Sequence, residues 1–292
     1  MDLVHYGDVL DQDILGLVTR RLGPDFGSAS LELSEKLRDL GIMGLLMEDS
    51  AESFSGYLVR SGLSRLIFLE RLASAKAEDS SRCSSFIEPL LDAIAGGDRR
   101  LAARIAEATP GGEPCGDTQD FYYSQIVQKL VVDEPTADSQ ALLREFKASG
   151  GGPRFEICLA LVERNVDGFD SAFERLLDHV QKALGAYAEW DYPGFEKRFA
   201  DFGSIDAVMD VYNGVRTDDE SLDAYGDLEE EVRRGGRQVF VEGLALLQLA
   251  ESRGLAVRSG YRYCPARARG LKNTWFDWAA FLNQLPRTPG VG

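Results

Sequence analysis

The amino-acid sequence predicts an all-α protein built from stacked antiparallel helical hairpins, arranged as an irregular α-solenoid or a bundle. Three observations support this fold class. Apolar residues recur with the helical period along nearly the whole chain, and no segment shows the alternating pattern of a half-buried strand. The connections between the periodic segments are short, which places consecutive helices side by side. The chain of 292 residues, 44% of them hydrophobic, is also long enough to bury a sizeable core.

The first part of the chain contains a series of periodic segments that we expect to be helices. They run over residues 54–72, 86–95, 101–106, 121–131, 137–146 and 155–162. The clearest helix follows, with Asp167 as its N-cap and apolar residues spaced by three and four from Phe169 to Leu184. We expect this helix to end at Gly185.

Three connections share one form, in which an apolar helix end is followed by a few turn residues and a capping residue. They lie at 96–98, 133–136 and 164–167. Links of this length predict helical hairpins, and their unequal spacing argues against a regular repeat. Segments 109–114 and 150–153 are rich in Gly and Pro and are predicted to be loops, because neither has the strand-to-helix context of a phosphate-binding loop.

The last third of the chain carries the remaining predicted helices. One starts near Pro193 and places Phe195, Phe199 and Phe202 on one face, which favours core packing. The segment 239–250 is apolar on nearly every side and predicts a buried core helix. A final helix, capped by Asn273 and carrying Trp275, Trp278 and Phe281, is expected to dock on the rest of the fold.

The composition and the chain start restrict the location of the protein. Residues 1–5 show neither the basic region nor the apolar region of a signal peptide, and no lipid-attachment motif. The longest apolar run is well short of the roughly 20 residues that cross a bilayer. We therefore expect a cytoplasmic protein that does not bind membranes.

Cysteine and histidine are too few and too scattered to indicate a metal site or a cofactor. The four cysteines, Cys83, Cys115, Cys158 and Cys264, form no C-x-x-C pair, so reduced and packed thiols are expected. Only two histidines are present, and His179 lies at the edge of an apolar helix face, which favours a structural role. No cofactor, metal or catalytic residue is predicted, and we expect the protein not to be an enzyme.

Charge is distributed unevenly along the chain. The formal net charge is -16, but residues 232–292 contain ten basic and three acidic residues, about +7, which leaves about -23 for residues 1–231. Such a negative surface repels nucleic acid and attracts cationic proteins, although acidity also simply keeps a protein soluble. We expect the basic residues Arg262, Arg267, Arg269 and Lys272 to pair with acids of the same chain.

One segment stands out as a candidate partner-binding surface. Eight acidic residues lie within fourteen positions: Asp218, Asp219, Glu220, Asp223, Asp227, Glu229, Glu230 and Glu231. This segment has too few apolar residues to bury itself, so it is either a solvated loop or short exposed helix, or a contact surface for a basic partner. Trp190 and Tyr192 lie in a predicted connection, where they either pack in the core or anchor a partner.

Four stretches of the chain together resemble a known family. They are LLDAIAGGDRRLAARIAEA at 90–108, DFYYSQIVQKLV at 120–131, ALVERNVDGFDSAFERLLDHV at 160–180, and GLALLQLAESRGL followed by YRYCPARAR between 243 and 269. In this order they resemble the all-helical immunity proteins of bacterial polymorphic toxins, immunity protein family 49. The resemblance covers roughly residues 86–270, so we expect an immunity-like helical domain at 83–292 that follows an N-terminal helical region at 1–82, with one continuous core shared by both.

The resemblance implies a function in interbacterial competition. It implies that the protein binds a cognate toxin domain, in a 1:1 heterodimer, and neutralises the toxin by covering its active site. The acidity of the chain favours a cationic toxin, such as a nuclease or an ADP-ribosyltransferase. The sequence leaves alternatives open, above all an α-solenoid scaffold that binds peptides or partner proteins. A mimic of DNA would need carboxylates at phosphate-like spacing, and carboxylate-based catalysis would need a distinct acid pair.

Overall fold

The computed structural model describes residues 14, 16–17, 26–77, 79–111, 116–132, 137–183, 238–274 and 276–284. The α-helices in these ranges are α2 (Phe26–Met47), α3 (Ala51–Ala75), α4 (Glu88–Ala95), α5 (Arg99–Ala108), α6 (Thr118–Val131), α7 (Ala137–Ala148), α8 (Gly152–Glu163), α9 (Val166–Ala183), α13 (Val241–Ser252) and α14 (Trp278–Gln284). Short 3-10 helices lie at Ser80–Arg82 and Ala266–Ala268. These ranges contain no β-strand, only an isolated bridge between Tyr261 and Cys264. The predicted all-α fold is confirmed.

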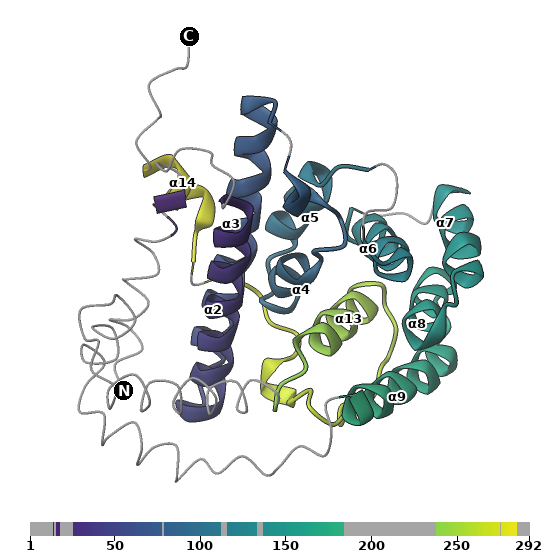
Figure 1. Cartoon of the computed structure of the whole chain (residues 1–292). Coiled ribbons are helices and arrows are strands. Elements are labelled where there is room, and N and C mark those ends of the chain that lie inside the picture. The colour runs from purple at the N-terminus through teal and green to yellow at the C-terminus, as the bar shows by residue number, and fades with distance from the viewer. Residues whose placement is uncertain are drawn as a thin grey trace, which may run out of the picture.

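Consecutive helices pack on one another as the short connections predicted. Contacts join α2 with α3, α4 with α5, α6 with α7, and α8 with α9. Further contacts join α5 with α6 and α7 with α8, so that the hairpins stack in chain order. Figure 1 shows the resulting arc, which begins at the long α2–α3 hairpin and ends at α7, α8 and α9.

Helix α2 has no counterpart among the predicted helices, and its contact with α3 explains why. Small polar residues line this contact: the Ser34 hydroxyl donates to the Ser61 carbonyl at 3.1 Å, and the Ser30 hydroxyl donates to the Ser64 carbonyl at 3.2 Å. All four serines are buried. Leu33, Leu37 and Leu40 supply an apolar period on the buried face of α2, but the serines interrupt it and so weaken the local signal for a helix.

A buried ion pair ties this hairpin to α4. Asp92 is fully buried and accepts hydrogen bonds from Arg38 Nε at 2.7 Å, Arg38 Nη2 at 3.0 Å and the Ser61 hydroxyl at 2.5 Å. Burial by itself lowers the pKa of Arg38, but attraction to Asp92 outweighs it and the pKa is raised. Three elements, α2, α3 and α4, are therefore fixed relative to one another by one carboxylate.

Two of the three predicted connections are described, and one needs correction. Asp98 caps α5 as predicted, because its carboxylate accepts a hydrogen bond from the Leu101 backbone N–H at 2.9 Å. Asp167 is not the N-cap of α9. It lies inside the helix, and the Asn165 side chain accepts from the Gly168 N–H at 3.0 Å instead. Asn and Asp are equally good caps, so sequence preference alone did not distinguish the two positions. Segment 133–136 lies outside the described residues.

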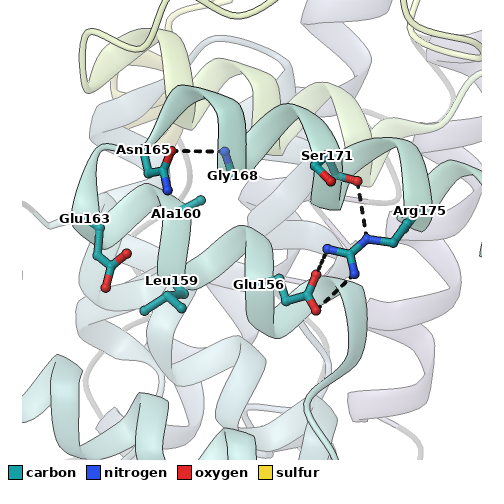
Figure 2. Close-up of a pocket in the computed structure, with 8 residues that line it drawn as sticks. All are labelled: Glu156, Leu159, Ala160, Glu163, Asn165, Gly168, Ser171 and Arg175. Atoms are coloured by element: carbon teal, nitrogen blue, oxygen red, sulfur yellow. Dashed lines mark hydrogen bonds and ion pairs between the residues drawn. The ribbon is translucent and has the colours of Figure 1, made fainter.

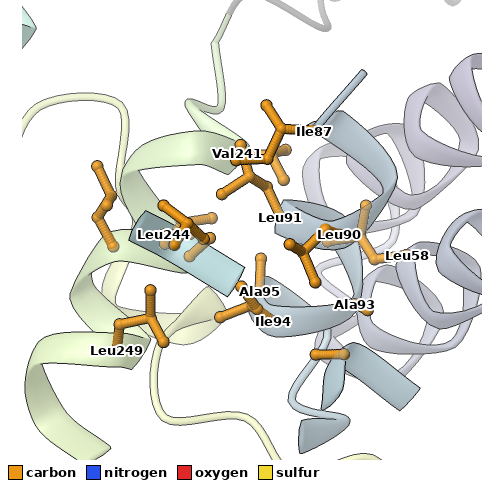
Figure 3. Close-up of a cluster of buried hydrophobic side chains, with 14 of the residues drawn as sticks. Leu58, Ile87, Leu90, Leu91, Ala93, Ile94, Ala95, Val241, Leu244 and Leu249 are labelled. Atoms are coloured by element: carbon orange, nitrogen blue, oxygen red, sulfur yellow. The ribbon is translucent and has the colours of Figure 1, made fainter. Parts of the chain in front are cut away.

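Helix α13 is the buried centre of the described structure. It covers most of the predicted core segment 239–250, and its apolar side chains are buried on all sides. Figure 1 shows α13 between α4 and the α8–α9 hairpin, and Figure 3 shows Val241 and Leu244 of α13 facing Leu91 of α4. One continuous cluster of buried apolar residues includes α13 and both sides of the predicted boundary at residue 83.

The last described helix begins later than predicted. Asn273 does not cap α14; its side chain accepts from the Phe276 N–H at 3.1 Å and stabilises the preceding turn. Asp277 caps the helix by accepting from the N–H groups of Ala279 and Ala280 at 3.1 and 3.0 Å. The predicted docking on the bundle is confirmed, since α14 contacts α3 and the Arg60 guanidinium lies 4.1 Å from the Phe276 ring centre.

The cysteines differ in their states. Cys158 and Cys264 are free and buried, as predicted. Cys83 is disulfide-bonded, so the predicted reduced state is wrong for this thiol. Disulfide pairs are set by distance in space rather than by spacing in sequence. Because disulfides are rare in the cytosol, this bond counts against the cytoplasmic prediction.

Candidate partner-binding surface

The sequence-predicted surface lies outside the residues that the structure describes. Trp190, Tyr192 and the acidic segment 218–231 all fall in the gap 184–237, as does the predicted helix that starts near Pro193. Their proposed role in partner binding stays a prediction. The described residues do show where this part of the chain leaves and rejoins the fold, namely after α9 and before α13.

Both ends of that gap are held at one edge of the fold by the segment Tyr261–Pro265. On one side, the Arg262 guanidinium bonds to Asp178 and donates to Gln181 Oε1 at 2.7 Å, close to the end of α9. On the other side, the Phe240 N–H donates to the Tyr263 carbonyl at 2.7 Å, just before α13 begins. The last turns of α9 and the residue before α13 therefore contact the same short segment.

Tyr261 of the same segment and the nearby Arg258 also contact the acidic residues of α9. The Tyr261 hydroxyl donates to Asp170, and its ring packs edge-on against Phe173 with 4.6 Å between the ring centres. Arg258 donates to Glu174 at 2.6 Å. Burial raises the pKa of Tyr261 to about 12, and the hydrogen bond to Asp170 adds to this effect. The Tyr261 side chain is therefore protonated and neutral in the folded protein at neutral pH.

These contacts confirm the predicted intramolecular charge pairing for three of the four basic residues. Arg262 pairs with acids of α9, Arg267 pairs with Asp49 and Arg269 pairs with Glu251. Lys272 is exposed. Because the basic C-terminal region already neutralises much of the acidity of α9, that helix is a poorer target for a cationic partner than its sequence suggests.

Partly buried charges also hold α6, α8 and α13 together. Arg154 of α8 donates to both carboxylate oxygens of Glu242 at 2.7 Å and to Asp120 at 3.0 Å. Its guanidinium lies 4.9 Å from the ring centre of Tyr123, which is fully buried. Pairs of this kind set the position of helices, and here the first turn of α13 is fastened to the first turn of α8.

Nearby Cys158 lacks the features of a reactive thiol. Burial, and to a lesser extent the charge of Glu242, raise the pKa of Cys158 well above its usual range. The thiol is therefore protonated at neutral pH. His179 is exposed on α9, so it is not a packed core residue. In the described ranges, no three His, Cys, Asp or Glu side chains gather as metal ligands do.

A groove lies between α8 and α9 on the described surface, and the sequence did not predict it. Its volume is about 220 Å³. Figure 2 shows Glu163 and Asn165 at one end, the ion pair of Glu156 with Arg175 at the other, and Leu159 between them. The sequence offered only a weak signal for this groove, namely the small residues Ala160 and Gly168 on two adjacent helices.

Comparison with protein-family models, curated proteins and solved structures gives no match to this chain. The resemblance to immunity proteins therefore stays a prediction from the four sequence stretches. Within the described ranges, no helix combines the length and the apolar character needed to span a bilayer.

Proposed function

We propose that this protein is an immunity protein, which binds a cognate bacterial toxin domain and neutralises it by covering the toxin active site. The proposal rests on the resemblance of the four sequence stretches and on the acidity of the chain. It requires no chemistry from the protein, only a stable complex. The partner is a cationic domain of a bacterial toxin, bound in a 1:1 ratio.

One structural observation supports treating the four stretches as a single signature. They correspond to α4 and α5, α6, the end of α8 with α9, and α13 with the segment that follows it. These elements meet around α13: α4 packs against it, Arg154 bridges α6 and α8 to it, and the Tyr261 ring packs on α9. Four stretches that pack into one unit support the resemblance to a single family better than four separate degenerate matches would.

The experiment that tests the proposal is a survival assay in bacteria. The candidate toxin is the protein domain encoded directly beside this gene, expressed with and without this protein. Immunity predicts that the domain alone kills the cells, that co-expression restores growth, and that the two proteins co-purify in equal amounts. Killing that co-expression does not relieve is the outcome that would rule out immunity towards this domain.

A second candidate function is an α-solenoid scaffold that binds peptides or partner proteins. The stacking of α6, α7, α8 and α9 in chain order favours it, because solenoids present such surfaces to extended ligands. A scaffold predicts several short ligands of modest affinity. An immunity protein predicts one folded partner that is bound tightly, so isolation of bound proteins from the native cell distinguishes the two.

A further inference from the structure

The groove between α8 and α9 stays open because two small residues face each other across it. Ala160 of α8 is buried beneath the groove, and Gly168 of α9 carries no side chain. A methyl group at Gly168 would lie 2.7 Å from the Asn165 side-chain nitrogen, too close to be accommodated without moving the residue that caps α9. A residue larger than glycine at this position would therefore have to displace the Asn165 side chain.

The groove has an uneven charge distribution. At one end, Glu156 accepts from Arg175 Nη1 at 3.1 Å and also bonds to its other terminal nitrogen, so these two charges neutralise each other. At the opposite end, Glu163 is exposed on the last residue of α8, and its carboxylate is the one charged group among the lining residues at this end. The neighbouring Arg164 is not among the residues that line the groove. The end at Glu163 is consequently the negative end.

The size of the groove suits a side chain better than a small molecule. Its volume of about 220 Å³ is below the roughly 300 to 1,000 Å³ of typical ligand sites. Its floor is apolar, formed by Leu159 and Ala160, and one carboxylate lies at its rim. An arginine matches both features, because its aliphatic stem packs on apolar surface while its guanidinium binds a carboxylate through charge-assisted hydrogen bonds.

We propose that the α8–α9 groove receives an arginine side chain of the cationic toxin domain, with the guanidinium bound by Glu163. This inference rests on the proposed function and specifies one contact of the complex. Arginine is among the residues that most often anchor protein interfaces, and such anchors fill pockets on the partner surface. The groove lies at the N-terminal end of α9, so it forms a contact independent of the chain segment that leaves α9 at its other end.

The test measures the dissociation constant for the neighbouring domain by titration calorimetry. Glu163→Arg replaces the carboxylate with a cation and is expected to weaken binding at least tenfold, as loss of an anchoring contact does. Glu163→Gln is expected to weaken binding less and to reduce its dependence on salt. Ser171→Trp fills the groove from an exposed rim position and is expected to act like Glu163→Arg, without any change of charge.

The matched control is Glu107→Arg. Glu107, like Glu163, is an exposed acid in the last turn of a helix, but it lies on α5 away from the groove. Its replacement changes the net charge equally and is expected to change the dissociation constant by less than about threefold. Thermal unfolding of each variant verifies that it is folded.

The outcomes separate the two proposals. Tight binding by the wild type that both Glu163→Arg and Ser171→Trp leave unchanged would overturn the groove contact while the immunity function stands. If Glu163→Arg and Glu107→Arg weaken binding equally and Ser171→Trp does not change it, binding depends only on the overall charge. This result would also overturn the groove contact. Absence of binding by the wild type would overturn both proposals.

Discussion

Tyr261 belongs to the sequence signature that suggested immunity proteins, and the structure assigns it a role in folding. Its side chain is only 7% exposed, and it makes two contacts with α9, one through its ring with Phe173 and one through its hydroxyl with Asp170. Two different substitutions of Tyr261 therefore measure these two contributions separately. Tyr261→Phe removes the hydroxyl contact alone, and Tyr261→Ala removes both.

The two variants differ in expected magnitude. A hydrogen bond to a charged group contributes about 1.5 to 3 kcal/mol, but the Asp170 side chain is 23% exposed and keeps Arg258 as a neighbour at 3.5 Å. We therefore expect Tyr261→Phe to reduce the free energy of unfolding by about 1 kcal/mol. Tyr261→Ala also leaves a cavity against Phe173, and truncation of a buried aromatic costs about 3 to 5 kcal/mol.

The assay is urea unfolding followed by circular dichroism, together with thermal unfolding. For a chain of this size, each kcal/mol lowers Tm by about 2 to 4 °C, so Tyr261→Phe is expected to lower it by about 2 to 4 °C and Tyr261→Ala by about 6 to 20 °C. Tyr122→Phe is the control, because that side chain is partly exposed and is expected to change the unfolding free energy by less than about 0.5 kcal/mol.

A specific result would refute this reasoning. If Tyr261→Phe kept full stability but lost binding to the toxin domain, the signature tyrosine would be an interface residue and its contact with α9 incidental. The structural role predicts the opposite, a less stable protein that still binds with the wild-type affinity at temperatures where it is folded.

Further predictions concern other buried groups and the acidic segment. Asp92→Ala is expected to cost about 3 to 5 kcal/mol in urea unfolding because it leaves Arg38 without its carboxylate, and the double variant Arg38→Met, Asp92→Leu is expected to recover most of this loss. Cys158 is expected to react with a thiol reagent only after unfolding, as its burial and raised pKa imply. Since the pKa of Tyr261 is raised from 10.0 to about 12, the stability that its protonated form contributes is complete below pH 10 and is lost as the pH rises towards 12, which an alkaline unfolding series of wild type against Tyr261→Phe measures. Neutral replacement of acidic residues outside the described ranges is expected to weaken toxin binding and its salt dependence, and unchanged affinity across a salt series would exclude that segment from the interface. The replaced residues are Asp218, Asp219, Glu220, Glu229, Glu230 and Glu231.

Helices with a clear apolar signal in the sequence were predictable, whereas α2, whose apolar face is interrupted by serines, was not. The predicted segments at 54–72, 121–131 and 239–250 lie within or overlap α3, α6 and α13. Helix α2 was missed because serines and glycines form much of its contact with α3. The hydrogen bonds that satisfy these serines come from residues about 30 positions away, and no local pattern reports them.

The position of helix ends was predictable only where one capping residue had no competitor. Asp98 follows two glycines and caps α5 as expected. Before α9 and α14, two good capping residues lie within four positions, and only one of each pair caps the helix. Asn165 caps α9 and Asp277 caps α14. The intrinsic capping preference of each residue type does not determine this outcome.

The candidate site was the least predictable part because the signature describes the core. The residues that carry the resemblance are largely buried contacts, such as those of α13, or fasteners such as Tyr261 and Arg262 that hold α9. Residues of this kind specify a fold, because replacing one of them disturbs the close packing of its neighbours. Glu163 also belongs to one of the four stretches, but its side chain is exposed, and we propose that exposed side chains of this kind determine the choice of partner. It follows that a resemblance of this type supports the class of function more strongly than it supports any particular toxin, and that the interface has to be found by varying surface residues while the core is left intact.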